Sequence, residues 1–339
     1  MPIPSGALRF NSDSGKLEYY NGEAWWQIDN FSADNATGGA RGVFAIGSSG
    51  SPLSYDTTTQ YITLSTTGNA VDFGDLTGTA RGYGASFASR TRGVFAAGQT
   101  GGTNQNNIDY VTISSTGTAT AFGNISDVLV RYPTGLSNAT RGVLVGGYDG
   151  TSARNEMRYV TIAATGNTVD YGDLTSATYG GTGISSQTRG IIAVGHEIPS
   201  RVNRIDFITI STLGNATDFG DNLAPRNGMF GTANSVRGIF AGGYITASPS
   251  EINAISYITI SSTGDAIDFG DITVARGYGA SAASSTRGTF IAGTVWPAGK
   301  NTIDYVTIMS TGNAIDFGDL IDSKTGGGAF GCSNGHGGL

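Results

Sequence analysis

The sequence is poor in the residues that build disulfides and metal centres. Among 339 residues there are one cysteine, Cys332, and two histidines, His196 and His336. A single cysteine excludes an intrachain disulfide, and so few thiol and imidazole groups argue against a zinc site. We therefore expect no metal and no cofactor.

Charge and long apolar runs are also scarce. Only 13% of the residues are charged, and the net charge is −7. Because phosphate binding needs clustered Lys and Arg, nucleic acid is not an expected partner. No apolar run approaches the length of a membrane-spanning helix, so membrane insertion is not expected. The segment Met1–Pro4 does not begin a signal peptide, which predicts synthesis and folding in the cytoplasm.

No catalytic constellation stands out. The string Asp-Phe-Gly occurs four times, first at residues 72–74. Without a Gly-rich phosphate loop or a helical frame, we interpret it as structural. The aspartates that follow, such as Asp75, are expected to cap turns, with calcium binding as the alternative. We expect a protein that is not an enzyme; a glycan lyase or hydrolase is the alternative.

What the sequence does contain is glycine, 54 residues of it, and six copies of one motif. Each copy continues with a strand such as Tyr110–Ile113, a turn glycine such as Gly117 and an aromatic residue such as Phe122. An Arg-Gly pair recurs every 48 to 51 residues, with its arginines at Arg41, Arg92, Arg141, Arg189, Arg237 and Arg287. A period near 50 with strand patterning is typical of propeller blades.

One repeat predicts four antiparallel strands, named a to d, at 85–89, 93–98, 108–113 and 118–122. The a–b and c–d connections are nearly constant between repeats, whereas the b–c and d–a connections vary. In a four-stranded meander the a–b and c–d connections lie at one end of the sheet, and the b–c and d–a connections lie at the other. The sequence therefore predicts a uniform face, where the repeated arginines act as scaffold, and a variable face suited to recognition.

The two ends of the repeat region complement each other. Residues 326–337 align with residues 82–93, which places Ala329–Ser333 at the strand a position with no strand b after it. The first repeat has a strand b, Val43–Ile46, but no strand a. The C-terminal segment is therefore expected to complete the first blade and to close an all-β, six-bladed β-propeller of four-stranded blades. His336 takes the place of the repeat arginine and is interpreted as a turn residue.

The variable b–c loops collect long polar and aromatic side chains that the rest of the repeat avoids. Such side chains suit a sugar or protein ligand; the alternative is that the loops vary because nothing constrains them. The candidate binding residues are Tyr55, Tyr148, Arg154, His196, Arg201, Arg204, Tyr244, Trp296 and Lys300.

Residues 1–29 do not belong to the repeat. Segments 7–10, 16–20 and 24–28 predict three strands separated by strong turn signals. So small a sheet cannot bury all of its aromatic residues, which are Phe10, Tyr19, Tyr20, Trp25 and Trp26. We predict an attachment or oligomerisation module at 1–29, a linker at 30–39 and the propeller at 40–339. The alternative is that the module packs on the side of the propeller.

The repeat also carries a resemblance. Strand b ending in Gly-Gly, at 146–147 and 242–243, with aromatic residues on strands c and d, resembles a kelch-type propeller, although strand d has Phe or Tyr where kelch repeats favour Trp. The pattern TRGVFAAG followed by NNIDYVTISSTG resembles repeats in virion structural proteins of tailed phages, particularly those of marine cyanobacteria, over about residues 40–337. The segment GALRFNSDSGKLEYYNGEAWWQI is similar to short β-modules of phage fibre and baseplate proteins.

The resemblance implies a virion structural protein: a fibre, spike or capsid decoration component located in the virion. Residues 1–29 would join it to other virion proteins, it would be oligomeric in its assembly, and the variable face would meet a glycan or a protein of the host surface. The alternative is a free lectin-like or protein-binding propeller outside any virion.

Overall fold

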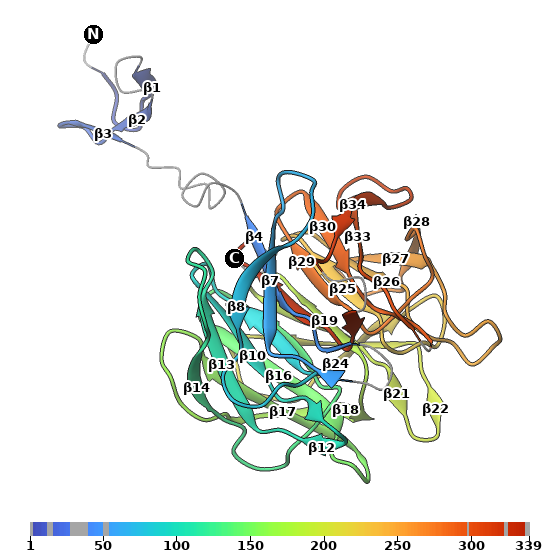
Figure 1. The fold of residues 1–339 in the computed structure, drawn as a ribbon. Helices are drawn as coiled ribbons and strands as arrows, with labels where there is room; N and C mark the ends of the chain where they lie inside the picture. The colour runs from blue at the N-terminus through green and yellow to red at the C-terminus, as the bar shows by residue number, and fades with distance from the viewer. Residues whose placement is uncertain are drawn as a thin grey trace. The chain divides into compact units, whose positions relative to one another are not determined.

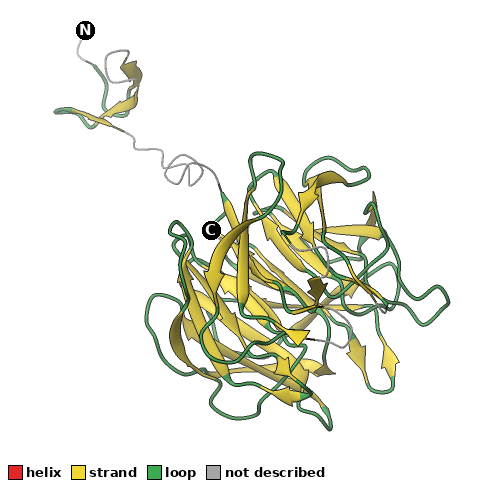
Figure 2. Cartoon of the chain, in the orientation of Figure 1, coloured by secondary structure: helices red, strands yellow, loops and turns green. Residues whose placement is uncertain are grey.

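The computed structural model describes residues 3–11, 16–27, 40–49, 54–296, 298–321 and 325–335, all of them strands or connections (Figure 2). None of these segments forms a helix that could cross a membrane. The chain divides into two compact units, Met1–Gly39 and Ala40–Leu339. The expected linker at 30–39 and His336 lie outside the described residues.

The first unit is a three-stranded antiparallel sheet of β1 (Leu8–Asn11), β2 (Lys16–Tyr20) and β3 (Trp25–Gln27). A tight turn joins β2 to β3: Asn21 Oδ1 accepts the main-chain N–H groups of Glu23 and Ala24, and Gly22 has a φ of +106°. Positive φ is accessible to glycine at little cost, so the Asn-Gly pair fixes this turn. The three strands predicted from the sequence are present.

The second unit contains six four-stranded antiparallel sheets among its described residues (Figure 1). In chain order of their repeats they are β36-β4-β7-β8 (Phe330–Ser333, Arg41–Ala45, Thr58–Thr63, Val71–Asp75), β9-β10-β13-β14 (Ala85–Ala88, Arg92–Ala96, Asn107–Thr112, Thr120–Asn124), β15-β16-β17-β18 (Thr134–Ser137, Arg141–Tyr148, Ala153–Thr161, Val169–Thr178), β19-β20-β23-β24 (Thr182–Ser185, Arg189–Ala193, Arg204–Thr209, Thr217–Asp221), β25-β26-β27-β28 (Phe230–Ala233, Arg237–Ala241, Ala254–Thr259, Ile267–Asp271) and β29-β30-β33-β34 (Ala280–Ala283, Arg287–Ile291, Thr302–Thr307, Ile315–Asp319).

Short strands occupy several b–c loops, for which the sequence predicted only that they vary between repeats. They are β5 (Ser48–Ser49) with β6 (Ser54–Tyr55), β11 (Gln99–Thr100) with β12 (Thr103–Asn104), β21 (His196–Glu197) with β22 (Ser200–Arg201), and β31 (Thr294–Val295) with β32 (Ala298–Gly299). The strand β35 (Thr325–Gly327) adds to β5. Hairpins of two residues per strand show no sequence periodicity, so the pattern could not reveal them.

The C-terminal strand pairs with the first strand of the repeat region. β36 lies antiparallel to β4, with Phe330 opposite Ala45 and Ser333 opposite Gly42. Strand a of the first sheet therefore comes from the opposite end of the chain, as the sequence alignment predicted. The unit is an all-β structure compatible with a β-propeller.

The apolar core lies between neighbouring sheets. Strand β10 is buried almost throughout, and both Val94 and Phe95 are fully inaccessible to solvent. Phe95 belongs to a cluster with Phe73 of the preceding sheet and Phe330 of β36. Strand b is thus buried on both faces, which explains why it is apolar without alternation.

Main-chain hydrogen bonds connect the outer strands of successive sheets. The N–H of Gly117, in a c–d turn, donates to the carbonyl of Phe73 in the sheet before it, over 2.7 Å. Equivalent bonds occur in every repeat, and the N–H of Gly68 in the first repeat donates to Phe317 of the sixth over 2.8 Å. The series therefore returns to its start.

The repeated arginines form a second series of this kind. The Arg92 guanidinium lies over the ring of Tyr110, 4.4 Å from its centroid, and Nη1 donates to the carbonyl of Ile162 in the next repeat over 3.0 Å. Arg287 of the sixth repeat donates to the carbonyl of Leu64 in the first over 3.1 Å. All six arginines lie over a strand c ring and donate to a carbonyl of the next repeat. These contacts fit the predicted scaffold role.

A third series runs through the residues just before each strand a. Six N–H groups each donate to the carbonyl of the equivalent residue one repeat earlier, over 2.7 to 2.9 Å. The bond from Tyr83 to Gly328 links the first of these positions to the last. The six residues, all with φ between 56° and 68°, are Tyr83, Tyr132, Gly180, Gly228, Tyr278 and Gly328.

Candidate functional site

The b–c loops and the d–a connections lie at the same end of the sheets. Isolated bridges pair Gly82 with Gln99, Arg131 with Tyr148, and Tyr179 with His196, each time joining a d–a connection to the following b–c loop. We call this end the variable face. The sequence predicted that these two kinds of connection would share one face.

Three tyrosines gather on this face, and we name Tyr83, Tyr132 and Tyr278 the tyrosine cluster. Their ring centroids lie 4.7, 5.8 and 5.9 Å apart. All three have positive φ, a conformation that costs a residue with a side chain about 1–3 kcal/mol. At two of the other three positions glycine is needed for space: a Cβ on Gly328 would lie 2.6 Å from the Tyr83 ring, and one on Gly228 would lie 2.9 Å from the Tyr278 ring.

The cluster phenols are held in their neutral form. Burial raises the pKa of Tyr132 to about 12, and burial is also the main cause that raises the pKa of Tyr83 and of Tyr278. The Tyr278 hydroxyl accepts a hydrogen bond from Asn227 Nδ2 over 2.6 Å, and the Tyr132 hydroxyl accepts one from Gln99 Nε2 over 3.4 Å. Each hydroxyl keeps its own hydrogen for donation.

A row of rings continues from the cluster. The centroid of Tyr179 lies 6.1 Å from Tyr132, 5.1 Å from Tyr148 and 5.0 Å from the ring of His196. The rings meet at tilted angles of 39° to 47°. Burial and the charge of Arg201 lower the pKa of His196, so its imidazole is neutral near pH 7.

Two more predicted residues border the cluster. Tyr244 has its ring centroid 5.3 Å from Tyr278 and donates its hydroxyl to the carbonyl of Thr294 over 2.7 Å. A ring carbon of Tyr55 lies 3.3 Å from the point where Gly82 would carry a Cβ. The structure therefore brings the predicted residues Tyr55, Tyr148, His196 and Tyr244 together on one face.

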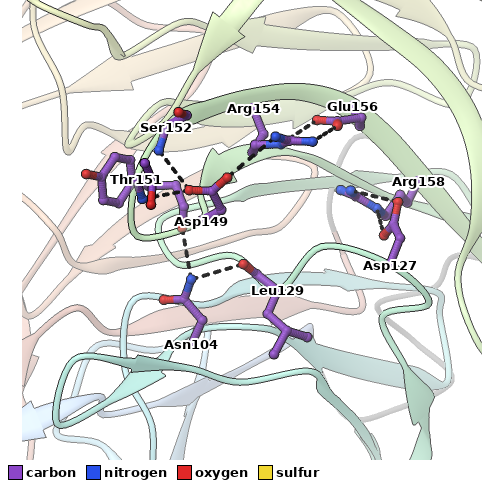
Figure 3. Close-up of polar contacts among 10 residues, drawn as sticks. Asn104, Asp127, Leu129, Asp149, Thr151, Ser152, Arg154, Glu156 and Arg158 are labelled. Atoms are coloured by element: carbon purple, nitrogen blue, oxygen red, sulfur yellow. Dashed lines mark hydrogen bonds and ion pairs between the residues drawn. The ribbon is translucent and has the colours of Figure 1, made fainter.

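Two of the predicted arginines are neutralised by neighbouring carboxylates. Figure 3 shows Arg154 between Asp149, 3.5 Å away, and Glu156, with Arg158 of the same strand paired to Asp127 nearby. The hydrogen bond to Glu156 is the main cause that raises the pKa of the Arg154 guanidinium. The charge of Arg154 is therefore balanced by carboxylates of the protein itself.

Arg204 is engaged in the same way. Its guanidinium lies 2.6 Å from a carboxylate oxygen of Glu197 and 3.0 Å from one of Asp206. Asp206 is buried, and burial is the first cause that raises its pKa despite the arginine beside it. Arg204 therefore balances an internal carboxylate and has little left for a ligand.

Arg201 and Arg131, by contrast, have no carboxylate partner among the described residues. Arg201 donates to Asn227 Oδ1 over 2.7 Å and Arg131 donates to Gln99 Oε1 over 3.0 Å. The Arg131 guanidinium lies 5.2 Å from the centroid of Tyr148. Sequence reasoning named Arg201 and missed Arg131, which lies on a d–a connection.

The last two predicted binding residues are not among the contacts of the cluster. Trp296 is 71% exposed, and its main-chain N–H donates to Glu251 Oε1 over 3.0 Å. The N–H of Lys300 donates to the carbonyl of Gly293 over 2.8 Å. Both lie in the b–c loop of the sixth repeat.

Sequence reasoning missed the tyrosines of the d–a connections: Tyr83, Tyr132, Tyr179 and Tyr278. The signal was present, because the string Arg-Gly-Tyr-Gly occurs at 81–84 and again at 276–279. The same strings carry two buried arginines, Arg81 and Arg276, which form buried ion pairs with Asp109 and Asp304 at 2.6 and 2.8 Å. A comparison of loop lengths between repeats hides a motif that occurs in only two of them.

The N-terminal sheet presents a second candidate surface. The register places Leu8 opposite Tyr19, Tyr19 opposite Trp26, and Phe10 opposite Leu17, so these five side chains share one side of the sheet. All five are exposed, Phe10 most of all at 68%. We call them the module's apolar face.

The opposite side of this small sheet is polar and better covered. Glu18 is buried and bonds to Arg9 over 2.8 Å and to Asn11 over 2.9 Å. The Arg9 guanidinium lies 4.2 Å from the centroid of Trp25, which packs 5.4 Å from Tyr20. Of the five predicted aromatic residues, Tyr20 and Trp25 therefore pack within the sheet, whereas Phe10, Tyr19 and Trp26 are exposed.

The repeated aspartates differ in part from the expectation. Asp75 accepts a hydrogen bond from Thr57 Oγ1 over 3.0 Å, but Asp319 donates its main-chain N–H to Asn69 Oδ1 of the first repeat over 3.0 Å. The capping oxygen there belongs to the residue after the turn glycine. In the described part of the chain, no three His, Cys, Asp or Glu side chains are grouped to hold a metal ion.

Comparisons with known proteins assign no role to these surfaces, so their role is inferred from the chemistry of their residues. No protein-family model matches the chain, and no curated protein matches it either.

Proposed function

We propose that the six sheets are the blades of a six-bladed β-propeller whose ring is closed by β36, and that the protein is a non-enzymatic structural component of a phage virion. The fold proposal is supported by three series of contacts that run from repeat to repeat and link the sixth to the first. The virion proposal is supported by the resemblance of the repeat and of residues 1–29 to phage proteins. A fibre, a spike or a capsid decoration component would each fit.

The observation that carries the virion role is the module's apolar face. A monomeric protein rarely leaves a row of five large apolar side chains on one side of a sheet without a partner. Aromatic residues are enriched in the buried cores of protein interfaces. We propose that this face docks on another virion protein and so attaches the propeller to the particle.

The variable face would then present the tyrosine cluster and the rings beside it to a glycan or a protein of the host surface. Tyrosine and arginine are the residues that most often dominate binding energy. A rigid frame with diversified loops is the arrangement in which such sites usually occur.

Two exchanges on the apolar face test attachment. Phe10→Ser together with Trp26→Ser should remove the docking surface, while Glu23→Gln, an exposed change in the turn, serves as the matched control. We expect mass spectrometry to detect the control variant in purified particles and not to detect the double variant there. The melting transition of the propeller should be the same in both.

Incorporation of the double variant at the wild-type level would overturn the anchor. Absence of even the wild-type protein from particles would overturn the virion role and favour the second candidate, a free lectin-like or protein-binding propeller. That candidate is supported by the same ring-lined variable face, which needs no virion to act.

A further inference from the structure

Two cations of the variable face are held by amides that also hold the tyrosine cluster. Asn227 accepts from Arg201 Nε at its Oδ1, over 2.7 Å, and donates from Nδ2 to the Tyr278 hydroxyl, over 2.6 Å. A second donor of Arg201, Nη1, reaches Thr246 Oγ1 over 3.3 Å. The guanidinium is thus fixed by neutral groups, which do not offset its positive charge.

The second cation repeats this arrangement. Arg131 Nη1 donates to Gln99 Oε1 over 3.0 Å, and Gln99 Nε2 lies 3.4 Å from the Tyr132 hydroxyl. The same Nη1 donates to the carbonyl of Gly102 over 2.9 Å. Arg131 Nε is buried and has no hydrogen-bond partner. In the part of the chain that the structure describes, both cations are therefore held in place without a carboxylate partner.

The rings of Tyr148, Tyr179 and His196 lie near both cations. The Arg131 guanidinium is over the Tyr148 ring. Burial and the neighbouring Tyr148 raise the pKa of the Tyr179 phenol, and the charges of Arg201 and Arg131 both oppose that rise. The strand register also places His196 opposite Arg201, so the row Tyr148–Tyr179–His196 runs from one cation to the other.

The face is rich in donors and poor in acceptors. The nearby carboxylates are already used: Glu197 binds Arg204 and Ser176, and Glu251 accepts from Ser250 over 3.0 Å and from the main-chain N–H of Trp296. The two guanidinium groups of Arg131 and Arg201 therefore remain for a ligand. Such a surface favours an oxygen-rich anion.

Among oxygen-rich anions, the rings select for sugars. A sugar ring packs its C–H face against an aromatic ring, and a guanidinium binds a carboxylate or sulfate through two donors at once. Nucleic acid is disfavoured, because the protein carries a net charge of −7 and two cations cannot offset the repulsion of a phosphate backbone.

We infer that the ligand of the variable face is an acidic glycan, whose sugar rings stack on Tyr148, Tyr179 and His196 and whose acid groups bind Arg131 and Arg201. This inference rests on the binding role proposed for the face. It narrows that role from any glycan or protein to sugars that carry carboxylate or sulfate groups.

Two matched pairs of probes test the inference on the full chain. Oligogalacturonate is compared with its methyl ester, and dextran sulfate with dextran, by isothermal titration calorimetry. We expect binding of at least one acidic probe, no binding of its neutral partner, and affinity that weakens with added salt. Polyglutamate is titrated as a probe for acidic peptides.

Variants locate the site. Arg201→Gln and Tyr179→Ala should each weaken binding of the acidic probe about tenfold or more. Arg90→Gln removes the same charge from an exposed position of the uniform face and should leave binding within about twofold. Circular dichroism melts of all three variants separate lost binding from lost folding.

Equal binding of a charged probe and its neutral partner would overturn the inference, as would binding of polyglutamate alone or no binding of either acidic probe. These results leave the virion proposal untouched, since that proposal depends on particle incorporation. Conversely, acidic-glycan binding by a protein absent from particles would uphold the inference and overturn the virion role.

Discussion

At the scale of single residues, the repeated arginine links one sheet to the next. The guanidinium of Arg92 covers the Tyr110 ring and donates to the carbonyls of Ile162 and Ala163 over 3.0 and 2.9 Å. These carbonyls lie at the end of strand c in the following repeat, where strand pairing ends. The arginine therefore supplies donors to groups that the ladder leaves open.

We predict that Arg92→Ala lowers the free energy of unfolding by about 1–3 kcal/mol, because a charge-assisted hydrogen bond and a cation–π contact are lost together. Arg90→Ala, two residues earlier and exposed, should change it by less than about 0.5 kcal/mol. Urea unfolding followed by circular dichroism measures both. Equal stability of the two variants would show that the arginine is not part of the scaffold.

The tyrosine cluster predicts a loss of stability in alkali. Folding raises the pKa of Tyr132 from its ordinary value of 10 to about 12, mainly by burial, and the pKa of Tyr278 rises for the same reason. Above pH 10 the unfolded chain therefore releases phenolic protons that the folded protein retains. Because the unfolded state then binds fewer protons, the free energy of unfolding falls as pH rises from 10 to about 12.

Urea midpoints measured across this window check the prediction. The double variant Tyr132→Phe and Tyr278→Phe keeps the rings and removes two of the titrating groups, so its stability should fall less steeply with pH. The same slope in variant and wild type would assign the alkaline loss to other groups.

Some residues of the fold could be predicted from the sequence and others could not. The repeated arginines and the ring of Tyr110 recur in one register, so their structural role could be predicted. The ion pairs of strand c do not recur in this way: Arg81 on a d–a connection pairs with Asp109 on strand c, whereas Asp127 on a connection pairs with Arg158 on the strand. The contact is kept while its two charges exchange places, which position-by-position comparison cannot detect.

At the scale of elements, strand β36 is the one whose contribution can be isolated. It pairs with β4 along its whole length, and Ser333 Oγ accepts from the N–H of Ala283 over 3.1 Å and donates to its carbonyl over 2.8 Å. The strand therefore contacts both the first sheet and the strand a of the sixth sheet. Without it, β4 would present a free edge.

We predict that deletion of residues 326–339 causes aggregation and lowers the melting temperature, because an unpaired apolar edge strand pairs readily with other chains. Deletion of residues 336–339 alone is the matched control and should leave both properties unchanged. Light scattering and thermal unfolding of the two truncated proteins give the comparison. A monomeric 326–339 deletion with unchanged melting would contradict the proposed closure by this strand.

Element positions followed from the sequence where a strand is long and patterned. The predicted strand at 108–113 corresponds to β13 at Asn107–Thr112, and the predicted strand at 85–89 corresponds to β9 at Ala85–Ala88. The short hairpins of the b–c loops could not be predicted, since turn geometry forms them rather than alternating burial. The tyrosines come from separate repeats and meet only in the tertiary structure, so no local sequence pattern predicts their cluster.

At the scale of the whole molecule, an array of equal repeats can be open or closed. In an open array each repeat contacts only its neighbours, so the loss of one repeat removes only its share of the stability. In a closed ring every blade is needed, because the number of blades sets the angle between neighbours. The series of contacts from the sixth repeat to the first favours the ring.

Deletion of one whole repeat distinguishes the two. Removing residues 189–236 joins Thr188 to Arg237, so the Arg-Gly motif continues and strand β19 meets strand β26 in the place of β20. Five sheets would then have to close with contacts shaped for six. We predict that this deletion abolishes cooperative unfolding, whereas an open array would keep a two-state transition whose urea m-value is smaller by about one sixth. Urea titrations of the deleted and complete proteins, followed by circular dichroism and fluorescence together, decide between them. A cooperative five-repeat protein would refute the closed six-bladed ring.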